Sequence, residues 1–590
     1  MTPRLLVRDL TRLVALVICV ATVEAQQTPA AAMPTGDGVI VGQVVDASSG
    51  TPIGGVTVTL AIMGARTSVA CDAQGRFVFS NLAAGQFSLS ATQPGYIGGH
   101  PDQRFPTDGG RPIDLAKSEH VTDVRLRLWK LAVIAGKVED AAGEPLVGVT
   151  VRALQKSLVG GQVQFTADGT TTTRATTDDH GNYRLAGLTP GVYVVAVPSS
   201  DQQRPSPAQT FPTVFYLSSL SASGGTVLTL TSGEEKLGVD VKMAATPMFS
   251  VSGKIVSAEA VPSGVRLELV RAESDKVLTN LDLATTSAAA DGHFAFSKVP
   301  AGQYTIRVLR LPSAQGLPTA RFSGNGSGFT SVGGPLPTPG TPMLLGPLPE
   351  TRSLWADASV TVQDKNPDDV TLALRPGARI SGRIVFEGAL PRPTSDELQA
   401  SPIFLVPIDG REAMSQSGRI EADGTFTTGS VAPGEYVLFT FLHTRGWGMK
   451  STLVDGRESA GSPIEIGTKD ITDVVMTMTD QSNVLSGVVK GADEKPQSDA
   501  SIFVFSANRD MWKYSGSMLT PLLREVRPGR AGAYQTSLVP GQEYFVAAVT
   551  GEVPEFWATA DFLEPLTKFA VKVRLDAGEK GVLDLKARPR

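Results

Sequence analysis

The sequence predicts an all-β protein in which five tandem Greek-key β-sandwich domains follow a signal peptide. Three observations lead to this fold class. One phrase of sequence returns five times at domain-sized spacing, each copy holds two aromatic residues ten positions apart, and apolar residues alternate with a period of two with almost no helical periodicity. A chain of 590 residues is too long for one core, and its 61 Gly and 40 Pro suit strands joined by many turns.

Each copy opens on a short strand whose second residue is glycine. These glycines are Gly42, Gly136, Gly253, Gly382 and Gly487. They lie 94 to 129 residues apart, which is the size of a domain and not of a solenoid unit. We call the copies repeats 1 to 5 and expect one domain in each. The expected bounds are 38–130, 131–246, 247–376 with a Pro/Gly-rich loop at 311–348, 377–480, and a divergent 481–590.

Later in each repeat, a turn glycine is followed by an aromatic residue at position +2 and a second one at position +12. The pairs are Phe77 and Phe87, Tyr183 and Tyr193, Phe294 and Tyr304, Phe426 and Tyr436, and Tyr534 and Tyr544. We interpret the phrase as strand, turn, strand, with both rings in one core, because a slip of one residue would turn a ring to the opposite face. A tyrosine at the second position can also form a hydrogen bond at the end of the sandwich.

The first two repeats carry a longer pattern. Residues 136–197 read G-x-V-x-D-x-x-G-x-P-[IL]-x-G-V-T-V and then D-x-x-G-x-[FY]-x-[FL]-x-x-L-x-x-G-x-[FY], and residues 42–95 differ by one inserted residue. This pattern resembles the carboxypeptidase regulatory-like domain. The resemblance implies a transthyretin-like, immunoglobulin-like sandwich of the carbohydrate-binding-like fold group. Such domains stand beside metallocarboxypeptidase domains, at the N-termini of TonB-dependent receptors and in arrays of secreted bacterial proteins. Repeats 3 and 4 match mainly in their second halves, and repeat 5 matches least.

The N-terminus has the pattern of a signal peptide. Arg4, Arg8 and Arg12 precede the apolar run 13–23, and Ala25 ends an acceptable cleavage site. We expect a signal peptide at 1–25, a linker at 26–37, and a mature protein that is periplasmic, outer-membrane-associated or extracellular. No later stretch reaches 18 consecutive apolar residues, so we expect no transmembrane segment in the mature chain.

The sequence shows no pattern of catalytic residues. The histidines are His100, His120, His180, His293 and His443, and none begins an H-x-x-E pair. We therefore expect no enzyme activity, no catalytic residue, no metal and no cofactor. Asp72, or Asp178 with Asp179, is a turn-forming residue in this interpretation, because two carboxylates fall short of the ligands that calcium takes. A formal charge of −5 argues against nucleic acid as a partner. Cys71, alone in the mature chain, reads as a small strand residue.

The loops that differ between repeats are the expected place for function, because rigid sandwiches present their binding residues on loops. The candidate ligand-binding aromatics are Tyr96, Phe215, Tyr216, Trp447 and Trp512. Alternatively, these rings fold back and cap the cores. We expect a secreted, non-enzymatic binding or structural protein, with a polysaccharide or a surface protein as its partner. Two alternatives stay open: a regulatory chain for a separate metallocarboxypeptidase or other exported enzyme, and an envelope scaffold without a small ligand. The oligomeric state is not predicted.

Overall fold

The structure is a computed structural model. It describes residues 33–62, 65–159, 162–166, 173–199, 206, 208–221, 224–258, 264–272, 284–310, 319–322, 329–332, 347–408, 416–440, 442, 444, 446–514, 522–529 and 531–590. The expected signal peptide, most of the linker, most of the loop 311–348 and His443 lie outside these residues.

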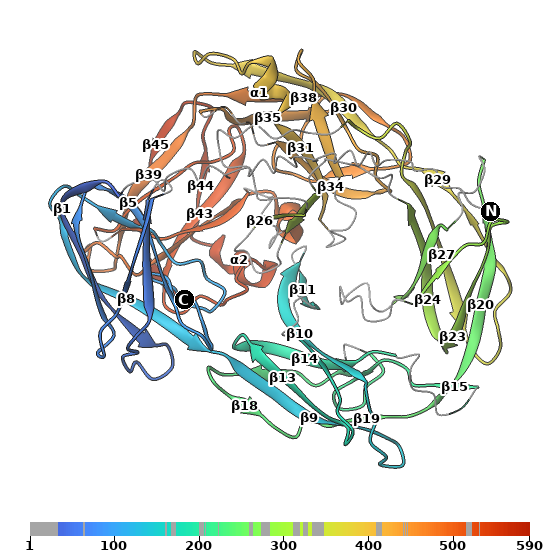
Figure 1. The fold of residues 1–590 in the computed structure, drawn as a ribbon. Coiled ribbons are helices and arrows are strands. Elements are labelled where there is room, and N and C mark those ends of the chain that lie inside the picture. The colour runs from blue at the N-terminus through green and yellow to red at the C-terminus, as the bar shows by residue number, and fades with distance from the viewer. Residues whose placement is uncertain are drawn as a thin grey trace, which may run out of the picture.

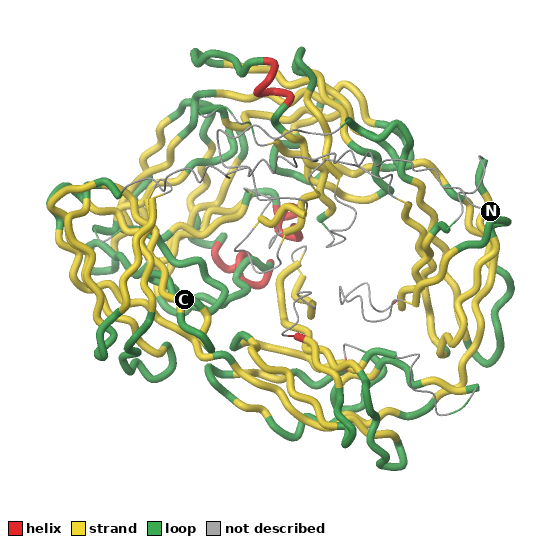
Figure 2. Tube along the Cα trace, in the orientation of Figure 1, coloured by secondary structure: helices red, strands yellow, loops and turns green. Residues whose placement is uncertain are grey.

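Nearly all the regular secondary structure of the described residues is strand, which confirms an all-β protein of several sandwiches (Figure 2). Its two α-helices are short, α1 (Ser395–Gln399) and α2 (Ala560–Leu566), and a 3-10 turn spans Arg509–Tyr514. None of the helices described is long and apolar enough to cross a membrane.

The strands fall into the five repeats. Repeat 1 holds β1 (Thr35–Asp46), β2 (Thr57–Ile62), β3 (Ala65–Ala70), β4 (Arg76–Leu82), β5 (Gly85–Thr92), β6 (Tyr96–Ile97), β7 (Ile113–Leu115) and β8 (His120–Lys130). Repeat 2 holds β9 (Ala132–Asp140), β10 (Thr150–Val159), β11 (Gln162–Thr166), β12 (Arg174–Thr176), β13 (Asn182–Leu188), β14 (Gly191–Val197), β15 (Gln209–Thr210), β16 (Val214–Phe215), β17 (Leu228–Leu230), β18 (Glu235–Lys236) and β19 (Val241–Met243). Repeat 3 holds β20 (Thr246–Val256), β21 (Arg266–Arg271), β22 (Ala284–Ser287), β23 (His293–Pro300), β24 (Gly302–Arg310), β25 (Thr319–Phe322), β26 (Phe329–Val332), β27 (Leu354–Val362), β28 (Val370–Ala373) and β29 (Arg375–Pro376).

The last two repeats follow the same order. Repeat 4 holds β30 (Ile380–Glu387), β31 (Pro402–Pro407), β32 (Gln416–Ile420), β33 (Thr425–Thr428), β34 (Gly434–Thr440), β35 (Gly448–Val454), β36 (Arg457–Glu458), β37 (Ile464–Ile466) and β38 (Ile471–Thr479). Repeat 5 holds β39 (Val484–Lys490), β40 (Ser501–Ser506), β41 (Leu523–Val526), β42 (Ala533–Thr536), β43 (Glu543–Thr550), β44 (Val571–Arg574), β45 (Lys580–Val582), β46 (Leu585–Lys586) and β47 (Arg588–Pro589).

One pairing scheme recurs in all five repeats. The opening strand pairs in parallel with the closing strand and antiparallel with the strand that carries the first aromatic residue, as β1 does with β8 and β4. The early strand pairs antiparallel with the strand of the second aromatic residue, as β2 does with β5. The two sheets are separate except in repeat 4, where β32 joins them into one nine-stranded sheet.

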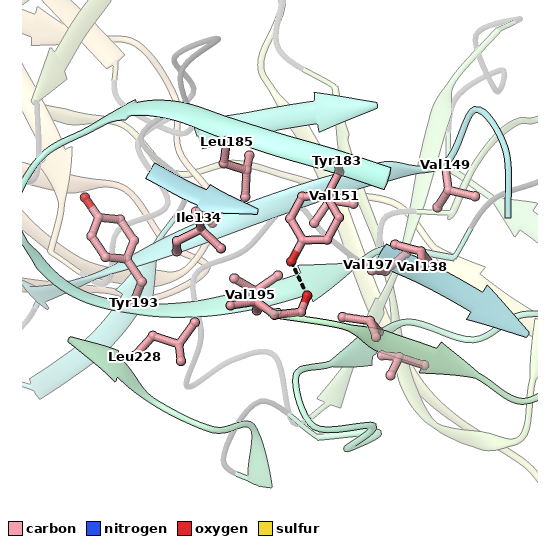
Figure 3. Close-up of a cluster of buried hydrophobic side chains, with 14 of the residues drawn as sticks. Ile134, Val138, Val149, Val151, Tyr183, Leu185, Tyr193, Val195, Val197 and Leu228 are labelled. Carbon is pink, nitrogen blue, oxygen red and sulfur yellow. Dashed lines mark hydrogen bonds between the residues drawn. The ribbon is translucent and has the colours of Figure 1, made fainter. Parts of the chain in front are cut away.

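The two aromatic rings of each repeat enter one core, as the spacing predicts. They lie in the same buried cluster in every repeat, and they come from two separate sheets in every repeat except the fourth. Figure 3 shows this for Tyr183 and Tyr193 in repeat 2. The predicted tyrosine hydrogen bond is also present, because the hydroxyls of Tyr193, Tyr304 and Tyr436 each donate to the carbonyl oxygen four residues earlier, at 2.7–2.9 Å. The fixed spacing therefore serves packing and an end-cap bond together.

The opening glycine is required by the close approach of the closing strand. A Cβ at Gly382 would stand 1.9 Å from the carbonyl oxygen of Val474, and one at Gly487 would stand 1.9 Å from that of Leu583. Any side chain here would force these parallel strands apart. The repeated glycine thus belongs to the strand pairing of the fold.

The repeats follow one another around a ring, so that the last repeat lies beside the first (Figure 1). Repeat 5, in red, contacts repeat 1, in blue, through hydrogen bonds between residues about 400 positions apart in sequence. This closure places two ends of the array in direct contact.

Candidate functional site

Two of the five candidate aromatics are buried. Phe215 on β16 is 4% exposed and packs with Leu154 and Val194 on the outer face of the repeat 2 sheet. Trp512 is 3% exposed, lies edge-on to Phe505, and donates from Nε1 to the carbonyl oxygen of Ser506 at 2.8 Å. Both positions correspond to the alternative in which loop aromatics fold back onto a core.

The other three candidate rings are half-buried. Tyr96 packs against the core of repeat 1, and Tyr216 packs against the core of repeat 2. Trp447 packs against the core of repeat 4, with its ring centroid 5.0 Å from that of Phe386. The indole Nε1 of Trp447 is buried without a hydrogen-bond partner among the described atoms. The five rings lie in four different repeats, and the fold does not gather them into one site. Ligand binding by any of them stays a prediction.

The aspartates before the turn glycines hold the turns. The Oδ1 atom of Asp72 accepts from the backbone amides of Gln74 and Arg76, and Oδ1 of Asp178 accepts from those of His180 and Asn182. These are the expected turn-forming aspartates. Asp178, Asp179 and His180 also form the one group among the described residues with metal-ligand spacing, but all three are exposed.

Cys71 is a buried free thiol. Its Sγ accepts a hydrogen bond from the amide of Val56 at 3.1 Å and donates to the carbonyl oxygen of Ile53 at 3.2 Å. The residue packs in the repeat 1 core. A thiol enclosed in this way serves packing, and its burial removes the access that a reactive cysteine needs.

The differing loops are used largely to join repeats. The strand β15, from a loop of repeat 2, pairs with β20 of repeat 3. Between repeats 3 and 4, the buried Ser353 donates from its amide to Ser430 Oγ at 2.7 Å, and Arg352 makes two hydrogen bonds to Asp470, at 2.6 and 2.7 Å. In these contacts a segment that varies between repeats meets its neighbour, and Ser430 shows that the partner residue can lie in the repeated phrase itself.

The junction between repeats 4 and 5 has an apolar centre, with one ion pair at its side between Lys513 Nζ and Glu435 Oε1, 3.5 Å apart. Tyr514, in the 3-10 turn of repeat 5, is buried against Ile408 and Val437 of repeat 4. Its hydroxyl donates to Glu435 Oε1 at 2.6 Å. Burial, followed by the hydrogen bond to that carboxylate, raises the pKa of Tyr514. The packed ring and the hydrogen bond to Glu435 help to fix this junction.

The contact between repeats 1 and 5 is charged. The loop after β6 supplies Arg104, whose NH1 donates to Ser501 Oγ at 3.1 Å and whose NH2 donates to Glu525 Oε2 at 2.6 Å. From the other side, Arg527 donates to the carbonyl oxygen of Asp102 at 2.8 Å and to the carboxylate of Asp108. Charges of both signs thus stand on each face. We call this set of contacts the end-to-end interface.

Two further contacts widen the end-to-end interface. Arg111 NH1 donates to the carbonyl oxygen of Pro528 at 2.8 Å, and Thr107 Oγ1 donates to Glu555 Oε1 at 2.6 Å. Repeat 2 reaches the same place, where Lys156 Nζ lies 5.6 Å from the ring centroid of Phe556. Three repeats therefore meet at the segment that follows β43.

The charged residues of the end-to-end interface are not among those predicted from the sequence. Arg104 stands in the variable stretch QPGYIGGHPDQRF, in which Tyr96 is the predicted residue. Its partner Glu525 lies 421 positions away. A charged loop residue is usually solvated, and one sequence gives no signal for a pairing at that distance.

Comparison with protein families finds a profile that matches the first two repeats. The profile of the carboxypeptidase regulatory-like domain matches residues 39–115 and 133–243, as the sequence pattern predicted. The profile of the BOS complex subunit NOMO1-like, second beta sandwich domain, matches residues 248–310 in repeat 3. A search of curated proteins found no match to the chain.

Solved structures with a weak likeness are bacterial pilins. The minor pilin GBS52 of Streptococcus agalactiae has 15% identity and a TM-score of 0.21, with 38% of this chain and 99% of that chain covered. The shaft pilin SpaA of Lactobacillus rhamnosus GG has 13% identity and a TM-score of 0.19, with 36% and 99% covered. Matches at such scores carry no argument about function. The repeated pairing scheme shows an array of β-sandwiches, and the first two repeats match the profile of the carboxypeptidase regulatory-like domain.

Proposed function

We propose that this protein is an exported, non-enzymatic structural protein whose β-sandwiches form a closed scaffold. The observation that carries the proposal is the use of the variable loops: those of repeats 1, 2 and 5 contact other repeats. Side chains that make such contacts hold the repeats together. We further propose that each repeat is one domain within the bounds predicted from the sequence, and the separate buried clusters support this division.

Binding of a carbohydrate or a cell-surface ligand is the finer form of this proposal. Trp447 supports it best among the candidate aromatics, because it lies in a loop and its ring is only half-buried. A sugar ring that stacks on the exposed part of the indole would use this surface. Export by residues 1–25 is a second part of the proposal and rests on the sequence pattern alone.

A glycan array probed with the mature chain separates the two forms. Binding to a polysaccharide that Trp447→Ala abolishes and Trp512→Phe leaves unchanged would support the ligand-binding form, because Trp512 is buried and serves as a matched control. If the chain binds no glycan, the result supports the form of the proposal in which the scaffold has no small ligand. Hydrolysis of peptides by the pure protein would contradict the non-enzymatic proposal. Co-purification of an exported peptidase would favour a regulatory chain.

A further inference from the structure

The two faces of the end-to-end interface are built to bind each other. On repeat 1, the loop is held by its own hydrogen bonds: the amide of Arg104 donates to Asp108 Oδ2 at 3.0 Å, and the side chain of the buried Gln103 bridges from the amide of His100 to the carbonyl oxygen of Pro106. A loop fixed in this way loses little freedom when it meets its partner. The face is therefore preorganised by repeat 1 itself.

The face on repeat 5 is equally well defined. Ser501, at the start of β40, donates to Glu525 Oε1 at 2.6 Å, and Arg527 Nε lies 3.5 Å from the same oxygen. The side chains of Glu525 and Arg527 are only 11% and 13% exposed in the closed chain. Charges that are desolvated and paired in this way carry more interaction energy than exposed ion pairs.

Covalent linkage does not hold these faces together. They belong to the first and last repeats, so closure of the array must offset the entropy lost when distant parts of one chain are joined. Interfaces that form and separate are more polar than permanent ones. The end-to-end interface is of the polar kind, whereas the junction between repeats 4 and 5 buries Tyr514, Ile408 and Val437.

We propose that the end-to-end interface is a separable binding interface, in which complementary charged faces of repeats 1 and 5 bind each other and close the chain into a ring. The proposal does not depend on carbohydrate binding or on export. It follows that the same two faces recognise each other when they belong to two copies of the chain. Such an arrangement joins unlike faces, which is a heterologous contact.

Charge reversal in the full mature chain tests this proposal. Arg104→Glu and Glu525→Arg each place like charges across the interface within one chain. We expect each variant alone to remain monomeric and become more extended, with the closed fraction reduced at least about tenfold. The double variant Arg104→Glu/Glu525→Arg restores opposite charges, so we expect it to regain the compactness of the unmodified chain.

Mixing the two single variants gives the sharpest readout. The glutamate introduced by Arg104→Glu in one chain then meets the arginine introduced by Glu525→Arg in the other. The unchanged Arg104 of the second chain meets the unchanged Glu525 of the first. We expect a complex of twice the mass in sedimentation velocity, which neither variant forms alone. The matched control is Arg509→Glu, because Arg509 pairs with Glu564 within repeat 5 and away from the interface. This control should stay closed and monomeric.

Two outcomes would overturn the proposal. Single variants that stay as compact as the unmodified chain, together with a mixture that stays monomeric, would contradict it. A double variant as extended as the single ones would contradict it too. A salt titration of the unmodified chain by small-angle scattering keeps the proposal testable if a variant does not fold: expansion with rising salt supports it, and a constant radius of gyration contradicts it.

Discussion

Repeat 5 contacts another repeat on two sides, and the two contacts differ in chemistry. Toward repeat 4 it offers Tyr514, which is buried against aliphatic side chains. Toward repeat 1 it offers Glu525 and Arg527, which pair with charged groups. Repeats 4 and 5 are consecutive in the chain, so their contact never has to form between separate bodies. The ends of the array have no such link, and charges both guide their encounter and fix its register.

The same sandwich can thus be joined in two ways. An apolar junction is insensitive to salt and does not select its partner by charge. A charged interface responds to salt and pH and rejects a mismatched face. Each of the following predictions changes one junction and leaves the other as its control.

The largest effect is expected at the apolar junction. Tyr514→Ala removes a buried ring from between Ile408 and Val437. We expect the free energy of unfolding of repeats 4 and 5 to fall by about 3–5 kcal/mol, with the same loss at low and high salt. Urea denaturation measures it. Tyr514→Phe keeps the ring and loses the hydroxyl that donates to Glu435, so it should cost about 1 kcal/mol. Equal losses for the two variants would mean that packing does not carry this junction.

Of the two contacts that repeat 5 makes, the end-to-end interface should respond more strongly to salt. Raising the ionic strength from roughly 0.05 to 1 M shortens the screening length to about 3 Å. We expect the array to open while the denaturation midpoint of repeats 4 and 5 keeps its value. Small-angle scattering and urea denaturation on the same samples make the measurement. Opening that is insensitive to salt would show that the ion pairs do not hold the ends.

Acid should open the closed array of repeats, because it protonates Asp108 in the end-to-end interface. Burial alone would raise its pKa, but the hydrogen bond from Arg527, the backbone amide of Arg104 and the positive charge of Arg527 outweigh burial and lower it. Arg104 and Arg111 face the same place, with Asp102 and Glu525 as the neighbouring acids. The lowered pKa is that of Asp108 in the closed state. The ionised carboxylate therefore stabilises closure at pH values above its ordinary pKa of about 4. That contribution is lost as the pH falls through the lowered value.

We therefore expect a constant closed fraction from pH 8 to about 5 and a decline below about 4. Scattering across that range detects the decline. Asp108→Asn is the control, since the amide keeps an acceptor but cannot titrate. Its closed fraction should be lower at neutral pH, and the acid decline should be shallower. An equally steep decline in this variant would assign the response to other carboxylates.

The smallest effect is expected at Glu555, and it has the opposite sign. Burial raises the pKa of Glu555, against the hydrogen bond from Thr107 and the charge of Lys156, which lower it. A raised pKa in the closed state means that the ionised carboxylate opposes closure at neutral pH. Glu555→Gln keeps an acceptor for Thr107, so we expect closure to be slightly stronger at pH 7. A weaker closure would show that the charge pairing with Lys156 outweighs burial.

The sequence predicted the inside of each repeat better than the contacts between repeats. The ten-residue spacing of Phe77 and Phe87 predicts a shared core because period-two alternation fixes which face each ring takes. It also predicts the end-cap bond of Tyr436. These are local constraints that repeat in the sequence.

The contacts between repeats leave no such pattern. Trp512 and Trp447 look alike as loop tryptophans, yet the N–H of Trp512 donates to Ser506, whereas that of Trp447 has no partner among the residues that the structure describes. Which ring a core accepts depends on the insertions packed over it. Likewise, nothing in the sequence distinguishes Arg104 from other charged loop residues. Only the closed arrangement of the five repeats places it beside Glu525. A single sequence holds no record of that proximity.

The central claim is that the two ends of the array bind each other, and one distance tests it. Gly109→Cys on repeat 1 and Ala531→Cys on repeat 5 place spin labels at exposed positions beside the interface, while Cys71 is buried and escapes labelling. Pulsed dipolar spectroscopy on the doubly labelled chain at low salt should give one short, narrow distance distribution that broadens and lengthens as salt rises. A broad, long distribution at low salt would contradict the claim.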